Sequence, residues 1–260
     1  MQRYYTGKTI VLTGASSGIG AAMARLLAPM HATLVLTARR ADALAALADE
    51  VRAAGSVAHV VPLDLAEAGA ADRLAEAIAA LGLTPDVLVA NAGYGYTGAF
   101  EAQPEGDLDA MVAVNVAALT ALVRRIGSAL PSGGGVLTVA STASFQPIPY
   151  MAAYAATKAY VRSLSEALHA EWKGRGVAVT CLCPGPTVTE FGARAKMRSA
   201  FFRGGASPER VAIDGLRALA RRQRVEVSGA VNAVGAVGGT LLPTRLLLPL
   251  LASVMRRMSQ

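Results

Sequence analysis

The chain has 260 residues, of which 53% are hydrophobic and only 17% are charged. This length suits one large domain or two very small ones, and the composition excludes an intrinsically disordered protein. The net charge of +7 is uneven: residues 194–260 carry 12 Lys and Arg against 3 Asp and Glu, and residues 1–193 carry 13 against 15. The basic C-terminal quarter suits a membrane surface, an acidic substrate, nucleic acid or simply a solvated face.

Short apolar runs alternate with longer Ala- and Leu-rich runs along most of the chain. The predicted strands are 9–13, 33–37, 57–61, 87–90, 136–140 and 177–182, and the predicted helices lie near 18–29, 41–54, 66–81, 105–130 and 150–173. Strands that are apolar throughout are buried on both faces, as in a parallel sheet with right-handed helical crossovers. The sequence therefore predicts one doubly wound α/β domain of the Rossmann type, with a mostly parallel seven-stranded sheet.

The alternation weakens after residue 184. Residues 186–206 are predicted to be irregular, and Ser207 with Pro208 is typical of the start of a helix. Residues 231–251 are apolar but interrupted by Gly and Pro, and Arg245 lies among them, so a membrane-spanning helix is disfavoured. We assign residues 1–230 to the catalytic domain and 231–260 to an apolar, basic C-terminal extension.

The two cysteines are predicted to be reduced core residues, and they say nothing of secretion. Cys181 and Cys183 lie two apart on a predicted strand, so they share a face, and no second ligand pair accompanies them. None of the three histidines fits a triad or a metal site, and we expect no metal. The residues before Lys8 contain no long apolar run, which predicts that there is no signal peptide. We therefore expect a cytoplasmic protein.

A glycine-rich turn follows the first predicted strand. Gly14 permits a tight turn, Gly18 lets the backbone approach a pyrophosphate, and Gly20 lets the following helix pack closely on the strand. A helix that begins here presents free N–H groups and a partial positive charge to phosphates. Taken alone, such a turn is also common as an ordinary strand–helix connection.

Residues 13–20, TGASSGIG, resemble the cofactor loop of the classical short-chain dehydrogenase/reductase family. Four more segments follow in the order typical of that family, within residues 7–215: Asn91-Ala92-Gly93, Asn115, Ser141 with Tyr154 and Lys158, and Pro184-Gly185. The resemblance implies an oxidoreductase acting on CH–OH groups (EC 1.1.1.-) with a nicotinamide cofactor. The predicted cofactor-binding residues are Gly14, Ser16, Ser17, Gly18, Ile19, Gly20, Arg39, Asp64, Leu65, Asn91, Ala92, Gly93, Tyr154, Lys158, Pro184, Gly185, Thr187 and Thr189.

The end of the second strand predicts which nicotinamide is used. Ala38 stands where family members that use NAD carry Asp, and a guanidinium at Arg39 can hold a 2′-phosphate. NADP(H) is therefore favoured, although Arg39 and Arg40 could merely begin a solvated helix. Asp64 resembles the family position that contacts the adenine, or it could cap the next helix.

The predicted catalytic residues are Asn115, Ser141, Tyr154 and Lys158. Tyr154 and Lys158 are four apart on a helix and so share a face, where the ammonium is expected to lower the tyrosine pKa. Ser141 can bind the substrate oxygen, with Ser144 as the alternative hydroxyl. Asn115 resembles the family residue that holds a water molecule for proton relay.

The substrate and partners are less closely defined by the sequence. Phe191, Met197, Phe201 and Phe202 lie among Arg194, Lys196, Arg198 and Arg203, which predicts an apolar or acyl-type carbonyl substrate with a cationic rim, or a loop that simply packs on the core. Resemblance to the family implies a homodimer or homotetramer through residues 105–130 and 150–173. The extension fits peripheral contact with a membrane, burial in an oligomer or packing against the substrate pocket, whereas nucleic-acid binding has no motif. The alternatives are a membrane-associated nucleotide-binding interaction protein and an NAD-linked epimerase or dehydratase.

Overall fold

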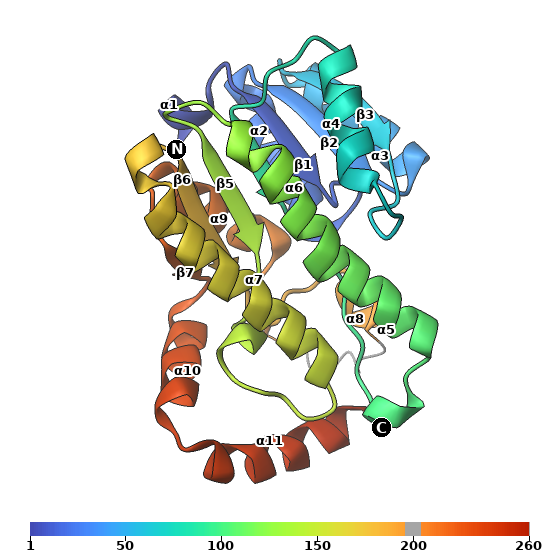
Figure 1. The fold of residues 1–260 in the computed structure, drawn as a ribbon, viewed down its shortest axis with the longest axis vertical. Helices are drawn as coiled ribbons and strands as arrows, with labels where there is room; N and C mark the ends of the chain where they lie inside the picture. The colour runs from blue at the N-terminus through green and yellow to red at the C-terminus, as the bar shows by residue number, and fades with distance from the viewer. Residues whose placement is uncertain (196–203, 260) are drawn as a thin grey trace.

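A seven-stranded parallel sheet organises the chain (Figure 1). The computed structural model describes residues 1–195 and 204–259. The strand order is β3-β2-β1-β4-β5-β6-β7. The chain builds the sheet outward from β1 in one direction and then, from β4 onward, in the other. The strands are β1 (Thr9–Thr13), β2 (Thr33–Ala38), β3 (Val57–Pro62), β4 (Val87–Ala90), β5 (Gly135–Val139), β6 (Ala178–Cys183) and β7 (Val225–Val227).

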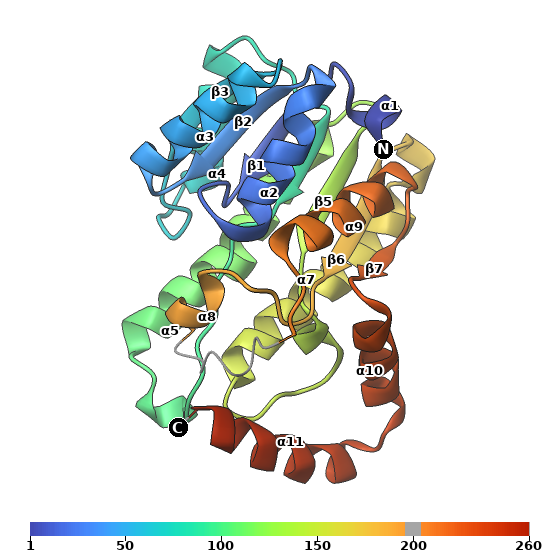
Figure 2. The same cartoon turned by 180° about the vertical axis from the view of Figure 1, so that it is seen from behind.

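Helices cover both faces of the sheet, as the predicted crossovers require. Figure 1 shows α4 (Ala70–Ala80), α6 (Leu119–Arg125) and α7 (Ala152–Glu171) on one face. Figure 2 shows α2 (Gly18–Leu27), α3 (Ala41–Ala53) and α9 (Pro208–Ala220) on the other. The remaining helices are α1 (Gln2–Tyr5), α5 (Glu105–Val112), α8 (Phe191–Arg194), α10 (Ala230–Leu241) and α11 (Thr244–Ser259).

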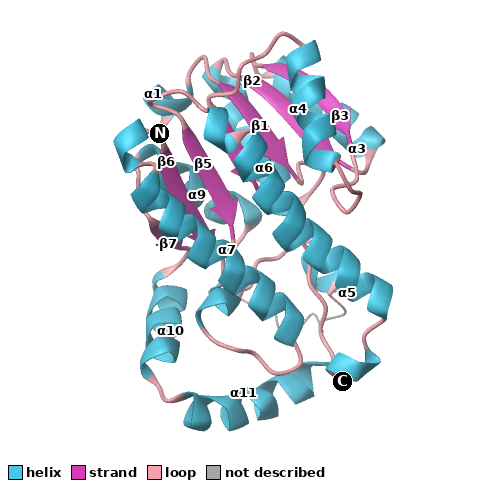
Figure 3. Cartoon of the chain, in the orientation of Figure 1, coloured by secondary structure: helices cyan, strands magenta, loops and turns pink. Residues whose placement is uncertain are grey.

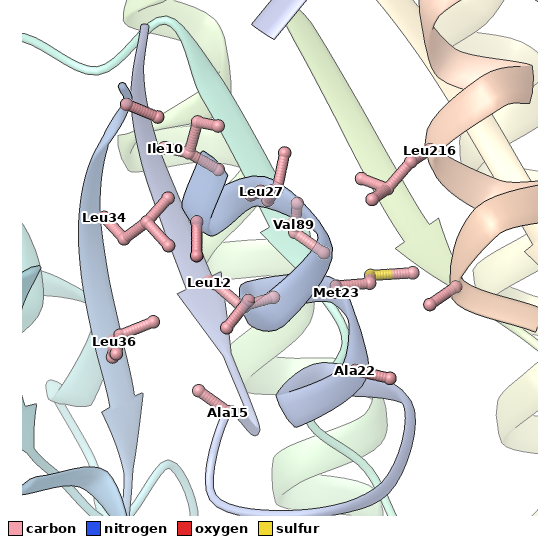
Figure 4. Packing of buried hydrophobic residues seen from close by; sticks show 14 of the residues in the cluster. Ile10, Leu12, Ala15, Ala22, Met23, Leu27, Leu34, Leu36, Val89 and Leu216 are labelled. Carbon is pink, nitrogen blue, oxygen red and sulfur yellow. The ribbon is translucent and has the colours of Figure 1, made fainter. Parts of the chain in front are cut away.

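Apolar strands form a core on each side of the sheet. On one side, Ile10, Leu12 and Leu34 pack against Leu27 of α2 and Leu216 of α9, and all five are completely buried (Figure 4). On the other side, Val11 and Val35 pack beneath α4 and α6. Each such side chain contributes about 1.5–3 kcal/mol when it is removed from water, so the alternation of strand side chains fixes the sheet between its helical layers.

The predicted fold class is confirmed, and most boundaries agree within one or two residues. The strand at 136–140 begins one residue earlier, and the strand at 177–182 is shifted one residue later. The helix expected from residue 66 begins at Ala70, because Gly69 with φ of +73° precedes it in a left-handed conformation. Ser207 caps α9 as predicted, accepting a hydrogen bond from Arg210 N at 3.2 Å.

The long helix predicted at 105–130 is interrupted. Between α5 and α6 the segment Ala113–Ala118 forms a π-helical turn that contains Asn115. The whole stretch Glu105–Ala129 has the length and apolar character of a membrane-spanning helix. Its apolar residues are accounted for by packing, because Leu119 and Leu122 are buried against the core under β4.

The C-terminal extension forms two helices beyond the carboxyl ends of the strands. Figure 3 shows the arrowheads of the central strands pointing toward the half of the molecule that contains α5 and α11. Helix α10 follows β7, and α11 runs across this half of the molecule toward α5. The extension therefore lies at the end of the sheet where the sequence predicts the active site.

Candidate active site

The glycine-rich turn between β1 and α2 forms a cradle. Gly14 and Gly18 have φ values of +67° and +54°, which favour glycine. A Cβ at Gly20 would lie 2.2 Å from Gly14 O, so only glycine allows α2 to approach the turn this closely. Asn91 Nδ2 donates to Thr13 O at 3.0 Å and to Gly14 O at 3.2 Å, and thereby fixes the turn to β4. The turn and the first N–H groups of α2 fit a pyrophosphate.

A cavity of about 360 Å³ opens beside this cradle, at the carboxyl ends of the strands. It is lined by all but one of the cofactor-binding residues predicted from the sequence. The exception is Gly20, which lies behind the turn. The cavity also reaches three of the four predicted catalytic residues, Ser141, Tyr154 and Lys158. The fold thus brings together residues that are up to 175 positions apart, from Gly14 to Thr189.

Two arginines stand at the β2 side of the cavity. The Arg39 side chain is 59% exposed, and its Nη1 lies 3.9 Å from Asp64 Oδ2. Arg40 Nη2 donates to Ser16 O at 3.1 Å and pairs with Glu190 Oε2 at 3.0 Å. Arg40 therefore bridges the glycine-rich turn and the segment after β6. This residue was not among the predicted site residues, although its position next to Arg39 was a usable signal.

Asp64 lies on the cavity rather than at a helix end. Its Oδ1 accepts a hydrogen bond from Ala66 N at 2.9 Å, which closes a local turn. The alternative that Asp64 caps the following helix is wrong, because α4 begins only at Ala70, after Gly69. The carboxylate thus lies beside Arg39 on the wall of the cavity.

Ser141 and Ser144 have different surroundings, which separates the two candidate hydroxyls. Ser141 lines the cavity together with Tyr154, and its Oγ donates to Pro184 O at 3.5 Å. Its Oγ also accepts from Ala143 N at 3.1 Å, so the side chain is held in place as a helical cap. Ser144 is buried, with its Oγ 3.8 Å from Cys183 Sγ, and does not line this cavity. Ser141 is therefore the hydroxyl that can meet a bound oxygen atom.

Tyr154 and Lys158 lie on one face of α7, as their spacing predicts, and both are buried. Lys158 is not among the groups that shift the pKa of Tyr154. Burial raises that pKa to about 12, and the nearby Ser141 hydroxyl offsets only part of the rise. Burial also lowers the pKa of Lys158 to about 8. Lys158 Nζ lies 5.8 Å from the centroid of the tyrosine ring and donates to Val139 O at 3.0 Å.

Asn115 lies behind the cavity, in the π-helical turn. Its Nδ2 donates to Tyr94 O at 2.9 Å and to Thr157 Oγ1 at 3.0 Å, and its Oδ1 accepts from Tyr94 N at 3.2 Å. A Cβ at Gly93 would lie 2.9 Å from Asn115 Oδ1 and 3.0 Å from Lys158 Nζ. Asn115 therefore ties the segment after β4 to α7, close to the lysine amine.

The inner end of the cavity is apolar. The Phe191 ring packs on the Tyr154 ring with a centroid separation of 5.5 Å, and Met151 and Met255 complete a hydrophobic cluster around the tyrosine. Gln146 lines the same end, and its Oε1 is buried without a hydrogen-bond partner among the described residues. Met151 could have been found from its position one turn before Tyr154. Met255 belongs to the C-terminal extension, for which lining of the substrate pocket was one of the expected alternatives.

Part of the predicted substrate segment 186–206 lies outside the described residues, including Lys196, Met197, Arg198, Phe201, Phe202 and Arg203. Phe191 lines the cavity as expected, and the Arg194 backbone ends α8. The cysteines are confirmed as free, buried core residues, with their Sγ atoms 3.8 Å apart on one face of β6.

Comparison with known proteins agrees with the geometry. Residues 8–199 match the short chain dehydrogenase family. The probable oxidoreductase EphD of Mycobacterium tuberculosis is 35% identical over 187 residues, which are 70% of this chain and 32% of EphD, so the chain spans about a third of that relative's length. A short-chain dehydrogenase from Sphingobium yanoikuyae, solved in complex with NADPH, is 28% identical with a TM-score of 0.80. The match covers 90% of this chain and 93% of that protein.

A second solved structure carries the other nicotinamide. The short chain dehydrogenase/reductase from Burkholderia phymatum, in complex with NAD, is 27% identical with a TM-score of 0.82, and the match covers 90% of this chain and 93% of that protein. The family match spans most of the sheet, and the serine, tyrosine and lysine lie together at the inner end of the cavity. The chain therefore belongs to the short-chain dehydrogenase/reductase family of oxidoreductases.

Proposed function

We propose that this protein is an NADP(H)-dependent reductase that converts an apolar or acyl-type ketone or aldehyde into the alcohol. One observation carries the proposal: a single cavity is lined by Arg39 after β2 and by Ser141 and Tyr154 beyond β5. A nucleotide that spans this distance would place its phosphates at the glycine cradle between them. The cofactor would supply the hydride, and the protein side chains would manage the proton.

The cofactor preference is supported by charge at the β2 end. The cavity there presents the guanidinium groups of Arg39 and Arg40 and no acidic residue at position 38, where Ala38 lines the wall. A 2′-phosphate would meet these guanidiniums in charge-assisted hydrogen bonds. Asp64, whose carboxylate lies 3.9 Å from Arg39, positions that side chain at the rim. Lys158 would hold the nicotinamide ribose.

The direction of the reaction is supported by the state of Tyr154. Because burial raises its pKa to about 12, the phenol is protonated at neutral pH and can donate that proton to a carbonyl oxygen. Ser141 lines the same part of the cavity and would bind the substrate oxygen as negative charge develops on it. A protonated phenol suits reduction, whereas oxidation requires the phenolate.

The substrate class is supported by the walls around Tyr154. Ile148, Met151, Phe191 and Met255 offer apolar surface to the group attached to the carbonyl carbon. Gln146 supplies the one amide at this end among the described lining residues, so a substrate with a second polar group is accommodated. These contacts favour a chain or ring that is mostly hydrocarbon.

Cofactor titration tests the proposal. NADPH and NADH binding would be followed by nicotinamide fluorescence for the wild type, for Arg39→Ala and for the control Arg25→Ala, whose guanidinium pairs with Glu50 outside the cavity. We expect Arg39→Ala to weaken NADPH binding about 10- to 100-fold and to leave NADH binding unchanged, because only the contact with the 2′-phosphate is lost. Arg25→Ala should bind both nucleotides as the wild type does. Equal or tighter binding of NADH by the wild type would contradict the NADP(H) assignment.

A further inference from the structure

The outward face of the C-terminal extension is apolar. Leu246, Leu250 and Val254 of α11 are 63%, 63% and 41% exposed. Residues four apart on an α-helix are offset by only about 40°, so these three side chains form one stripe. Exposed apolar side chains continue onto α10 and its connection to α11, and together they define the C-terminal apolar face: Val231, Val234, Leu241, Leu242, Leu246, Leu250 and Val254.

The opposite face of α11 holds the helix against the catalytic domain. Leu247 and Met255 are buried, and Met255 lines the catalytic cavity. Leu248 lies in a second, apolar groove on α7, beside Ala155 and Ala159. Because these contacts fix the helix, its exposed leucines do not belong to a free tail. Figure 2 shows α11 as the outermost element on this side of the molecule.

The charge of the extension is entirely positive. Residues 227–260 contain the three arginines Arg245, Arg256 and Arg257 and no Asp or Glu. With 3.6 residues per turn, Arg245 and Arg256 lie together at one border of the leucine stripe. Both are exposed, and Arg256 Nε donates to Tyr150 Oη at 2.8 Å. Apolar side chains bordered by arginines match the acyl and phosphate layers of a membrane surface.

We propose that the C-terminal apolar face binds the surface of a bilayer that contains anionic phospholipids. A second copy of the chain fits this face less well. A two-fold contact between antiparallel copies of α11 would place the two arginine borders on the same side, and residues 227–260 offer no Asp or Glu side chain to pair with them. Phospholipid headgroups supply that negative charge.

Membrane docking would also define how substrate arrives, which rests on the proposed reductase function. Helix α11 would contact lipid on one face, while Met255 on its other face lines the catalytic cavity. A long-chain ketone or aldehyde dissolved in the bilayer would therefore be held one helix away from Tyr154. The substrate class becomes a lipid-partitioned carbonyl compound rather than a small, water-soluble ketone.

Vesicle flotation of the full chain tests the docking. Phosphatidylcholine vesicles with and without phosphatidylglycerol would be compared for the wild type and Leu246→Ser/Leu250→Ser. The control is Val57→Ser/Leu81→Ser, which removes two apolar side chains that are 52% and 41% exposed elsewhere. We expect the wild type and the control to float with anionic vesicles, and the Leu246/Leu250 variant to bind at least about tenfold more weakly, because each buried leucine contributes favourably. Thermal denaturation would show that both double variants remain folded.

Two results would overturn the docking proposal. One is a wild type that floats with neither vesicle. The other is a wild type that sediments as a dimer through this face, so that Leu246→Ser/Leu250→Ser becomes monomeric without any vesicle binding. Reduction of a water-soluble ketone by NADPH is measured in parallel and should not change in the double variant. If flotation succeeds but no carbonyl compound is reduced, the proposed function fails and the membrane face stands.

Discussion

Tyr154 and Lys158 lie in a site that penalises charge on both side chains. Burial keeps the tyrosine protonated and brings the lysine pKa down to about 8, so the lysine loses its own proton within reach of neutral pH. Lys158 Nζ already donates to the Val139 carbonyl, which satisfies one of its hydrogens. In the proposed reduction, the proton would therefore come from Tyr154.

The raised tyrosine pKa predicts opposite pH dependence for the two directions. Below pH 12 the phenolate fraction grows about tenfold per pH unit, so alcohol oxidation by NADP⁺ should accelerate steadily as pH rises from neutral into the alkaline range. Ketone reduction uses the protonated phenol, which is already the dominant form at neutral pH. The rate of reduction should therefore not rise with pH. Initial rates in both directions would measure this. Tyr154→Phe should reduce both rates by at least about a hundredfold, and an alkaline optimum for reduction would argue against Tyr154 as its acid.

Spacing and chain order were sufficient to find most of this site. Gly14, Ser141 and Tyr154 each follow or begin a strongly apolar element, so their places in the fold follow from the strand and helix pattern. The raised pKa of Tyr154 was not predictable, because desolvation depends on what surrounds a side chain in three dimensions. Gln146 and Met255 have no motif and enter the cavity only through tertiary packing.

At the scale of elements, the π-helical turn between α5 and α6 positions Asn115. Its amide makes three hydrogen bonds, two of them to the backbone of Tyr94, and so connects α7 with the segment that follows β4. A π-helical turn inserts one extra residue per turn and is concentrated at functional sites. Here it directs a buried amide toward the lysine side of the cavity.

A substitution that removes the Asn115 amide should lower the stability of the protein and disturb the arrangement of the site. Asn115→Ala leaves Tyr94 N–H and C=O without partners, which costs about 1–3 kcal/mol for each group that stays buried. Urea denaturation should therefore show a clear loss of stability. Thr157→Val, which removes one acceptor of the same amide, should cost less. If Asn115→Ala is as stable as the wild type, the amide does not join these segments in solution.

The elements that sequence patterns missed are the ones with weak local signals. The strand β7 has three residues, Val225–Val227, and lies at the sheet edge, where no long apolar run is needed. Helix α4 begins later than the sequence predicts because Gly69 adopts a left-handed conformation, which composition does not reveal. In contrast, the buried strands β1 and β4 were located to the residue, since burial on both faces demands uninterrupted apolar sequence.

For the whole molecule, the cofactor should act as a stabilising ligand. The cavity is bordered by residues from the ends of β1, β2, β4, β5 and β6, so a bound nucleotide would connect both halves of the sheet. NADPH at about 100 times its Kd should add about 2.7 kcal/mol, which raises Tm by about 5–10 °C for a protein of this size. Differential scanning fluorimetry would measure the shift. Arg39→Ala should show a smaller one at the same NADPH concentration, and no shift with either nucleotide would contradict cofactor binding in this cavity.

The hydrogen bond between Tyr5 Oη and Leu216 O, 2.9 Å long and completely buried, joins residues 211 positions apart. Beside it α2 packs against α9, and Leu216 belongs to the same core as Leu27 (Figure 4). A ribosome adds about 5–20 residues per second, so α2 waits on the order of 10–40 s for the helix that covers it. During that time the first strands and α2 carry an open apolar side. The newborn chain is thus most prone to aggregation before its last quarter is synthesised, and chaperones have a defined interval in which to act.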